Sequence, residues 1–416
     1  MLSCVPQDGR SRRGNVALHS IAHDRLRRRR RAPAAIVKHQ IEHSLLKIRE
    51  LRTADELQSL SNDWDRLLGT RGEEVLASNF LWVSRWWAHL GRNRALRVLI
   101  AEEDARIVGI APLYVETLYR KRLLPVKVCS FIGDGLSDYG CVLAAGDRGA
   151  VCASFLEHIG KKRDWHELQL HNIPEATGDF ERLSAAGARL GFRIDAGHCE
   201  TNRCFFIPTG GDFSNYARSR GKNLRHDVAK RQRRLNEAGG YEVKFTPDIP
   251  FATFLDGAAA LHAKRQGEVG RQSFFQIPSE GEFIREVLNA YHRRGWVEYV
   301  AMMIDGKIAA YRLGFRYGGV VYDWNTGFDP EYNSFSVGKV LLYHWLQDLF
   351  RRPDVTEFNF MRGESDFKRM FASEFRLNRD FVVRHPRSLY ARGITLAETI
   401  WRATNVRSRK NGQPPE

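Results

Sequence analysis

A fourteen-residue pattern that occurs twice decides the fold: RVLIAEEDARIVGI at 97–110 and EYVAMMIDGKIAAY at 298–311. Each copy places apolar residues on both sides of a turn, Asp-Ala at 104–105 and Asp-Gly at 305–306. Asp-Gly between apolar runs is a strong β-hairpin signal, because the turn needs positive φ. The sequence therefore predicts the same hairpin in two halves of the chain.

The elements expected after each hairpin correspond as well, in the order strand, helix, strand, helix, strand. They are 127–132, 150–162, 165–170, 178–191 and 203–207 in the first half, and 320–324, 337–351, 356–360, 365–373 and 379–384 in the second. An opening strand at 46–51 and helices at 53–68 and 79–90 precede the first hairpin. The sequence thus predicts an α+β protein with two tandem domains, at 46–208 and 209–385, each a mixed β-sheet flanked by helices.

The helix expected at 79–90 carries Trp82, Trp86 and Trp87. Three tryptophans suggest a platform for a sugar, but their helical spacing favours packing in the core.

The formal net charge is +16, and most of the excess lies in residues 1–50 and 384–416. A folded nucleic-acid binder carries its basic surface on the fold, so this distribution argues against that class. The run Arg25–Arg31 remains open to two interpretations, contact with RNA or an anionic membrane face, and a solvated tail. We expect basic tails at 1–45, which we predict to be disordered, and at 386–416.

The six cysteines are scattered, with neither a CxxC pair nor histidines at zinc spacing. The sequence has neither a run of about 18 apolar residues nor the apolar segment of a secretory signal. We expect reduced thiols, no metal and a cytoplasmic location.

A basic amphipathic helix is predicted at 218–235, between the two halves. Leu224, Val228 and Leu235 form its apolar stripe, and Lys and Arg fill the other faces. It either holds an acidic or phosphorylated acceptor, with Arg225 as a contact, or is a solvated helix.

The segment GFDPEYNSFSVGKVLL at 327–342 carries the most specific chemistry. A strand ends, a turn with Pro330 follows, and a Ser/Gly loop opens a long helix. Unpartnered amides at a helix N-terminus, together with the helix dipole, favour an anion such as a pyrophosphate. Ser336 and Gly338 allow close approach to the backbone, and Lys339 adds a positive charge.

This segment resembles the GNAT acyltransferase superfamily. In that family a strand leads into Pro-Glu-Tyr, then Arg/Gln-x-x-Gly-x-Gly/Ala and a helix with paired leucines. Here 330–332 is Pro-Glu-Tyr, Asn333 replaces Arg or Gln, Ser336 replaces the first Gly, and Gly338 matches the last. The resemblance implies acyl-CoA, most simply acetyl-CoA, as co-substrate. The residues it implies for binding are Thr326, Gly327, Asn333, Ser334, Phe335, Ser336, Val337, Gly338 and Lys339.

A narrower resemblance covers roughly 50–385. The chain is similar to the tandem GNAT group associated with cellulose and exopolysaccharide biosynthesis (a BioF2-like acetyltransferase domain), which shares its architecture with FemAB-type aminoacyltransferases. The segments that carry it are WVSRWW at 82–87, VGIAPL at 108–113, FIGDGLSDY at 131–139 and FMRGESDFK at 360–368. In the last of these, Phe367 stands where the group has Tyr.

The GNAT resemblance implies direct attack of an acceptor on a thioester. Backbone N–H groups near Asn325–Gly327 would polarise the thioester carbonyl. A carboxylate, or a water that it orders, would serve as base, with Glu298, Asp323 and Asp366 as candidates. Lys368 is a candidate for holding a phosphate or carboxylate of the acceptor. The alternative for each acid is an ordinary surface or capping role.

A Gly-rich loop in the first half carries Asp134, Ser137, Asp138 and Tyr139. These residues either bind a sugar acceptor in a cleft between the domains or only shape a turn. The first half lacks a comparable donor loop, because Asp147 stands in AGDRG at 145–149, where a phosphate would lie. We therefore predict that the first domain has lost donor binding and serves acceptor recognition or structure.

Together these features predict a CoA-dependent acyltransferase that acts on an amine or hydroxyl of a sugar or cell-envelope intermediate. Two alternatives stay open: a FemAB-like transferase that uses aminoacyl-tRNA, and a non-catalytic accessory protein of polysaccharide production. Expected partners are a small-molecule or saccharide acceptor and, through the basic tails, an anionic membrane or polysaccharide machinery. Nucleic acid is expected only under the tRNA alternative.

Overall fold

The computed structural model describes residues 46–69, 78–120, 124–195, 199–391 and 393. The expected tail at 1–45, with its arginine run, and most of the tail at 386–416 lie outside the described residues. Among the described residues, no helix has the length and apolar character needed to cross a bilayer.

The first half carries the elements expected from the sequence, with shifted ends. They are β1 (Lys47–Leu51), α1 (Ala54–Gln58), α2 (Ser61–Gly69), α3 (Phe80–Leu90), β2 (Ala95–Glu103), β3 (Arg106–Arg120), β4 (Leu124–Phe131), β5 (Leu143–Ala144), α4 (Arg148–Lys161), β6 (Glu167–Pro174), η2 (Glu175–Thr177), α5 (Asp179–Arg189), β7 (Arg193–Ile194) and β8 (Thr201–Pro208). Helix α1 begins with a capping box, in which the Thr53 side chain and Glu56 each satisfy a backbone N–H of the other.

The second half repeats this order and places two further helices before its hairpin. Its elements are α6 (Phe213–Ser219), α7 (Gly221–Glu237), β9 (Glu242–Phe245), α8 (Phe251–Glu268), η3 (Phe274–Gln276), α9 (Pro278–Arg293), β10 (Val297–Ile304), β11 (Lys307–Tyr317), β12 (Val320–Phe328), η4 (Pro330–Phe335), α10 (Val337–Leu349), β13 (Glu357–Arg362), α11 (Asp366–Phe371) and β14 (Glu374–Arg384). The helix predicted at 218–235 corresponds to α7, whereas residues 218–219 belong to α6. Gly221, the first residue of α7, takes a positive φ of 86° at this junction.

The two hairpins match in detail. Asp104 and Ala105 have φ of 48° and 61°, and Asp305 and Gly306 have 49° and 74°. Both hairpins also shift register at the corresponding place, after Ala101 in β2 and after Met302 in β10. Equivalent turns and equivalent bulges support the predicted duplication at the level of backbone geometry.

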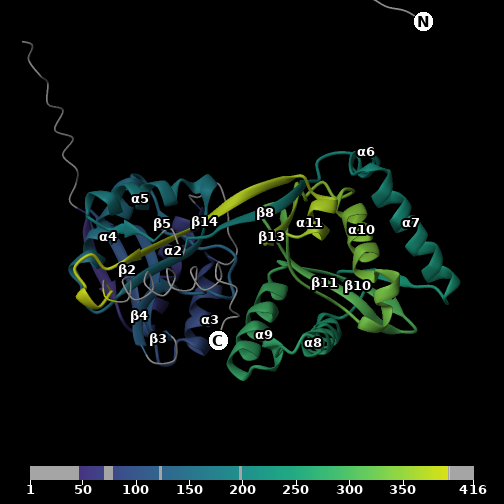
Figure 1. Ribbon diagram of the computed structural model, residues 1–416, viewed down its shortest axis with the longest axis horizontal. Coiled ribbons are helices and arrows are strands. Elements are labelled where there is room, and N and C mark those ends of the chain that lie inside the picture. Colours follow the sequence, from purple (N-terminus) through teal and green to yellow (C-terminus); the bar gives the residue numbers. More distant parts are fainter. Residues whose placement is uncertain (1–45, 70–77, 121–123, 196–198, 392, 394–416) are drawn as a thin grey trace, which may run out of the picture. The chain divides into compact units, whose positions relative to one another are not determined.

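The halves are joined by an exchange of their last strands. The sheet runs β1-β2-β3-β4-β6-β14-β8-β13-β12-β11-β10-β9. Strand β8, from the first half, pairs with β13 of the second, whereas β14, from the second half, pairs with β6 of the first. Strands β8 and β14 pair with each other and lie side by side in Figure 1. The boundary predicted at 208/209 therefore does not separate two self-contained sheets.

A shared core also crosses the boundary. One apolar cluster contains residues from Leu51 to Leu143 and from Ile249 to Phe315. Helix α3 packs on α9, where the rings of Trp82 and Phe283 meet edge to face at 5.1 Å. Trp82 and Trp86 are each 2% exposed, which confirms the core packing predicted for this helix.

Candidate functional site

The second half contains an open strand edge. Strands β12 and β13 run parallel and pair only where Val320–Tyr322 meets Glu357–Asn359. Beyond Tyr322, β12 has β11 as its only neighbour among the described strands, because its pairing with β13 ends there. Strand β12 also carries one extra residue against β11 between Tyr322 and Asn325. The backbone from Asp323 onward is thus available for pairing with an extended ligand.

The residues predicted on this edge are held by the neighbouring strand. The Asn325 side chain accepts a hydrogen bond from the Tyr311 hydroxyl, and the Thr326 hydroxyl donates to the Tyr311 carbonyl at 3.0 Å. Gly327 lies so close to the Tyr311 ring that a Cβ would approach it to 2.5 Å. These contacts fix the edge in place.

The chain then turns into α10 through η4. Asp329 caps η4 by accepting the amide of Glu331 at 3.1 Å, and Ser336 takes a left-handed conformation with φ of 53°. The first bonds into α10 run from the amides of Lys339 and Val340 to the carbonyl of Ser336, at 2.9 and 3.3 Å. The amides of Val337 and Gly338 have no partner among the described residues, and no side chain caps the helix.

This loop has room for an anion. Asn333 and Ser334 are exposed, and a Cβ built on Gly338 would meet nothing closer than Phe328 at 3.9 Å. Side chains therefore do not wall off the start of α10. Two amides that lack a partner among the described residues, at a helix N-terminus, are suited to binding an anionic group.

Two arginines of α7 reach the same loop. The Arg231 guanidinium donates to the Ser334 carbonyl at 2.6 Å, and Arg234 donates to the same oxygen at 3.4 Å. Arg234 also lies over the Phe335 ring, 5.3 Å from its centre. The sequence indicated a basic helix here but not which of its side chains face the loop.

Lys339 and Arg225, two basic residues predicted to contact ligands, interact differently in the structure. The Lys339 ammonium pairs with Asp227 of α7 at 2.7 Å, and this hydrogen bond lowers the pKa of Asp227. Lys339 therefore ties α7 to α10 instead of presenting a free charge. Arg225 lies on α7 and lines neither of the two pockets described below; its buried Nε has no partner among the described residues.

The three candidate carboxylates occupy different places. Glu298 accepts Arg352 at 2.9 Å, near the C-terminal end of α10 and away from the loop. Asp366 has a fully exposed side chain in the first turn of α11. Asp323 lies at the extra residue of β12, paired with Arg312, and burial raises its pKa although Arg312 opposes this. Its Oδ1 has no partner among the described residues, and of the three carboxylates only Asp323 lies on β12 where the open edge begins.

Lys368 is not a free cation. Its ammonium donates to the carbonyls of Phe360, Met361 and Arg362 at 2.9, 3.4 and 2.7 Å. All three ammonium hydrogens are thereby used on a bulge in β13, where Met361 takes a positive φ of 57°. To hold a phosphate or carboxylate of the acceptor, as predicted, the Lys368 ammonium would have to leave these carbonyls.

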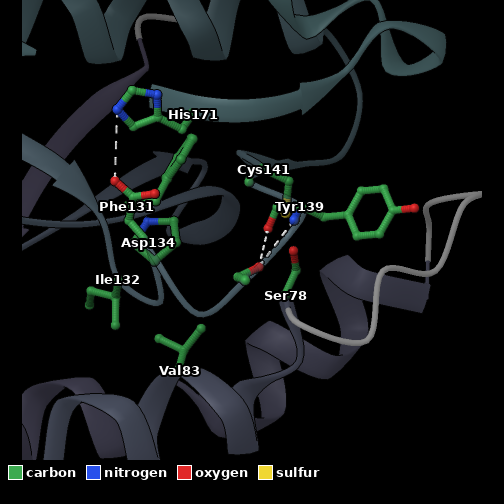
Figure 2. A pocket seen from close by; sticks show the side chains of 11 residues that line it. Ser78, Val83, Phe131, Ile132, Asp134, Tyr139, Cys141 and His171 are labelled. Atoms are coloured by element: carbon green, nitrogen blue, oxygen red, sulfur yellow. Dashed lines mark hydrogen bonds and ion pairs between the residues drawn. The ribbon is translucent and has the colours of Figure 1, made fainter. Parts of the chain in front are cut away.

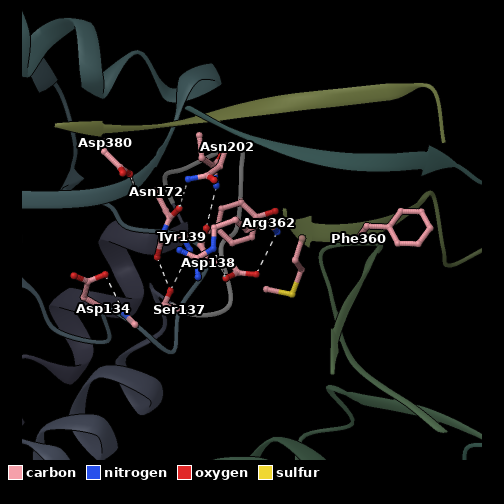
Figure 3. A network of polar contacts seen from close by, with 12 residues as sticks. Asp134, Ser137, Asp138, Tyr139, Asn172, Asn202, Phe360, Arg362 and Asp380 are labelled. Carbon is pink, nitrogen blue, oxygen red and sulfur yellow. Dashed lines mark hydrogen bonds and ion pairs between the residues drawn. The ribbon is translucent and has the colours of Figure 1, made fainter. Parts of the chain in front are cut away.

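The Gly-rich loop of the first half, which carries Asp138 and Tyr139, contacts this bulge of β13. Asp138 pairs with Arg362 at 3.3 Å (Figure 3). The Tyr139 hydroxyl donates to Asn359 at 3.2 Å. A pocket lies here, which we call the aromatic pocket. Its lining residues are Trp82, Leu136, Ser137, Asp138, Tyr139, Phe315, Tyr322, Trp324 and Met361.

A second pocket lies on the other side of the same loop. Asp134 and His171 line it, 3.9 Å apart, and the Tyr139 ring points away from them (Figure 2). His171 also pairs with Asp380 of β14 at 3.1 Å. Burial raises the pKa of Asp134, whereas the bond to Asp380 raises the pKa of His171 against the effect of burial. Ser137 and Tyr139 line both pockets, whereas Asp134 lines only this one and Asp138 only the aromatic pocket.

The first half has no equivalent of the donor loop. Asp147 caps α4 by accepting the amide of Ala150 at 3.0 Å, so a protein carboxylate already occupies this helix N-terminus. Gly140 donates to the Asn172 carbonyl at 3.0 Å and packs against β6, where a Cβ would approach the His171 carbonyl to 2.4 Å. Among the described residues, no group of three His, Cys, Asp or Glu side chains is placed to hold a metal ion.

Comparison with known proteins agrees with this geometry. Residues 222–369 match the family model of the acetyltransferase (GNAT) domain. The solved structure of FemX aligns with 82% of this chain and 97% of its own, at 12% identity and a TM-score of 0.53, which shows a common fold. A tandem GNAT protein from the clavulanic acid biosynthesis pathway aligns with 82% of this chain and 100% of its own, at 13% identity and a TM-score of 0.46. No curated protein matches the sequence. Residues 222–369, in the second half, are thus similar to the GNAT acetyltransferase domain, and the chain as a whole shares its fold with FemX.

Proposed function

We propose that the protein transfers an acyl group from an acyl-CoA, most simply acetyl-CoA, to an amine or hydroxyl of an acceptor bound between the two halves. The observation that carries this proposal is the start of α10, where the amides of Val337 and Gly338 lie in an open loop and have no partner in the part of the chain that the structure describes. CoA would supply the activated thioester. The second half supplies the donor site, and the first half supplies one wall of the acceptor site.

The residues of the chain have distinct tasks in this proposal. The amides of Val337 and Gly338 bind the diphosphate, with Arg231 and Arg234 adding positive charge at the rim. The open edge of β12 holds the extended part of the donor and directs backbone N–H groups at the thioester carbonyl. Asp323 is the base, acting directly or through a water, because the acceptor must lose a proton before or during attack.

The proposal also includes the class of acceptor. A small molecule or a saccharide, such as a cell-envelope or exopolysaccharide intermediate, would reach β12 past Asp138 and Tyr139. The first half then recognises the acceptor. It would not bind the donor, because the Asp147 carboxylate caps the start of α4, where a phosphate would lie. The basic tails would contribute contacts with an anionic membrane face or with polysaccharide machinery.

Calorimetric titration with acetyl-CoA tests the donor site. Gly338→Glu places a carboxylate where the diphosphate would lie, and an acid in the first turn of a helix does not weaken the fold. We expect the wild type and Gly338→Ala to bind acetyl-CoA and Gly338→Glu to show no binding. Gly338→Ala is the matched control, because the structure leaves room for its Cβ. Equal binding by all three proteins would remove this loop from the site.

One alternative has support of its own. The basic face of α7 beside the donor loop is also suited to RNA, so an aminoacyl-tRNA donor is a second candidate. It predicts that tRNA binds with a steep salt dependence and that acetyl-CoA does not bind. Binding of neither donor would favour a non-catalytic accessory protein.

A further inference from the structure

The aromatic pocket is walled mainly by rings from both halves. Trp82 comes from α3, Tyr139 from the loop of the first half, and Phe315, Tyr322 and Trp324 from β11 and β12. The rings of Tyr139 and Tyr322 meet edge to face at 6.2 Å, and those of Phe315 and Trp324 lie 5.5 Å apart. The side chains of Leu136 and Met361 complete the apolar walls.

Most polar groups of these walls are already bonded within the protein. The Ser137 hydroxyl donates to the Tyr139 carbonyl at 2.7 Å, and the Tyr139 hydroxyl donates to Asn359. The Asp138 carboxylate accepts both the side chain and the amide of Arg362, at 3.3 and 3.2 Å. A sugar ring in this pocket would bury several hydroxyls without partners, at about 1–3 kcal/mol for each.

The charges around the pocket do not favour a cation either. Arg362 neutralises Asp138, and the Lys368 ammonium lies close enough to Asp138 to interact with it electrostatically. A cage that binds cations by their contact with aromatic faces gains most when the site is not already positive. The walls therefore suit an uncharged apolar group.

The position of the pocket connects it to the proposed chemistry. Tyr322 and Trp324 flank Asp323 on β12, at the start of the open edge. A group held against these two rings would be next to the place where we expect the thioester. The indole N–H of Trp82 is buried in the wall without a partner among the described residues, so it can report on a molecule that enters.

We propose that the aromatic pocket holds an apolar ring or chain of the acceptor, so that the amine or hydroxyl to be acylated is carried on a hydrophobic group. This inference rests on the proposed function and narrows its acceptor class: a bare, fully hydroxylated sugar ring does not fit the pocket. A saccharide would qualify only through an apolar substituent.

The test is NMR of the indole groups in the full chain labelled with [15N]tryptophan, titrated with 2-phenylethylamine and with glucosamine. Both probes carry one ammonium and differ in apolar against hydroxylated character. We expect 2-phenylethylamine to shift the Trp82 indole signal, assigned with Trp82→Phe, at millimolar concentration, and glucosamine to leave it unmoved. Trp345, buried in another core cluster, is the internal control. The inference would be overturned if glucosamine or tetramethylammonium shifted the Trp82 signal and 2-phenylethylamine did not.

Two variants test whether the probe binds in the aromatic pocket. Leu136→Trp fills the pocket and should abolish the shift, whereas Leu124→Trp, at an exposed position of β4, should not. If Leu136→Trp does not fold, Tyr322→Ala should weaken the response at least fivefold, and an unchanged response would place the probe elsewhere. The NMR titration contains no CoA and therefore does not depend on the donor site. If acetyl-CoA fails to bind but 2-phenylethylamine still shifts the Trp82 signal, the proposed reaction is contradicted and the apolar pocket is not.

Discussion

Ala105 and Gly306 occupy the same position in the two duplicated turns, and both are exposed with positive φ. The left-handed region costs a residue with a Cβ about 1–2 kcal/mol, whereas glycine costs about 0.5–1 kcal/mol of entropy when it becomes ordered. We expect Ala105→Gly to raise the free energy of unfolding by about 0.5 kcal/mol, and Gly306→Ala to lower it by about 1 kcal/mol. Urea denaturation measures both, and a destabilising Ala105→Gly would contradict this account of the turn.

His171 is expected to make the stability of the protein depend on pH. Its bond to Asp380 raises its pKa, so the stabilisation is complete below the unfolded value of about 6.5 and is lost as pH rises through the folded pKa. The same bond, working against burial, lowers the pKa of Asp380, so its share is lost as pH falls through that lowered value.

Comparison of the wild type with His171→Asn between pH 4 and 9 tests this expectation. The loss of stability should be largest near pH 5–6 and should shrink above neutral pH. Asp134 and Arg362 also act on His171 and are unchanged in the comparison. His226→Asn, at an exposed position of α7, is the control for the substitution itself. A loss that grows with pH would contradict the assignment.

Single residues also show what the sequence could not reveal. Lys339 and Lys368 were predicted ligand contacts because each follows a promising local pattern. The structure pairs them with Asp227 and with three backbone carbonyls, and such partners are decided by tertiary packing. The approach of Arg231 to Ser334 was missed for the same reason.

Among the elements, α7 is the one whose contribution to binding of the proposed donor can be tested most directly. Arg231 and Arg234 face the loop before α10, whereas the Arg233 side chain is 71% exposed and lies near Glu237. We expect Arg231→Gln with Arg234→Gln to weaken acetyl-CoA binding about fivefold at low salt, from about 0.5 kcal/mol for each charge. Arg233→Gln should have no effect.

Titration calorimetry at low and high salt measures this difference. The effect of the double variant should shrink at high salt, because ions screen exposed charges. Equal weakening by Arg233→Gln would show a general effect of net charge and would remove α7 from the site.

The elements themselves were largely predictable. Turn chemistry and apolar spacing located both hairpins, the helix at 337–349 and the loop before it, within a few residues of the observed bounds. The aromatic pocket was not predicted, because Trp82, Tyr139 and Trp324 are far apart in sequence and meet only after the halves pack. The exchange of β8 and β14 was missed because strand alternation does not specify the partner strand.

At the scale of the whole molecule, the exchanged strands and the shared core predict that residues 46–391 unfold as one unit. Removing either half would leave β6 or β13 without its neighbouring strand. We expect one calorimetric transition with a van't Hoff enthalpy equal to the calorimetric enthalpy. Two separate transitions would contradict this expectation and would show that the halves unfold independently.

The central claim is that the donor binds at the start of α10 and along the open edge of β12. Amide hydrogen exchange of the full chain with and without acetyl-CoA tests both parts together. The account predicts slower exchange at 323–328 and 336–338 and no change at 145–150, where Asp147 caps the equivalent helix of the first half. Unchanged exchange at 323–338, or protection at 145–150 instead, would contradict it.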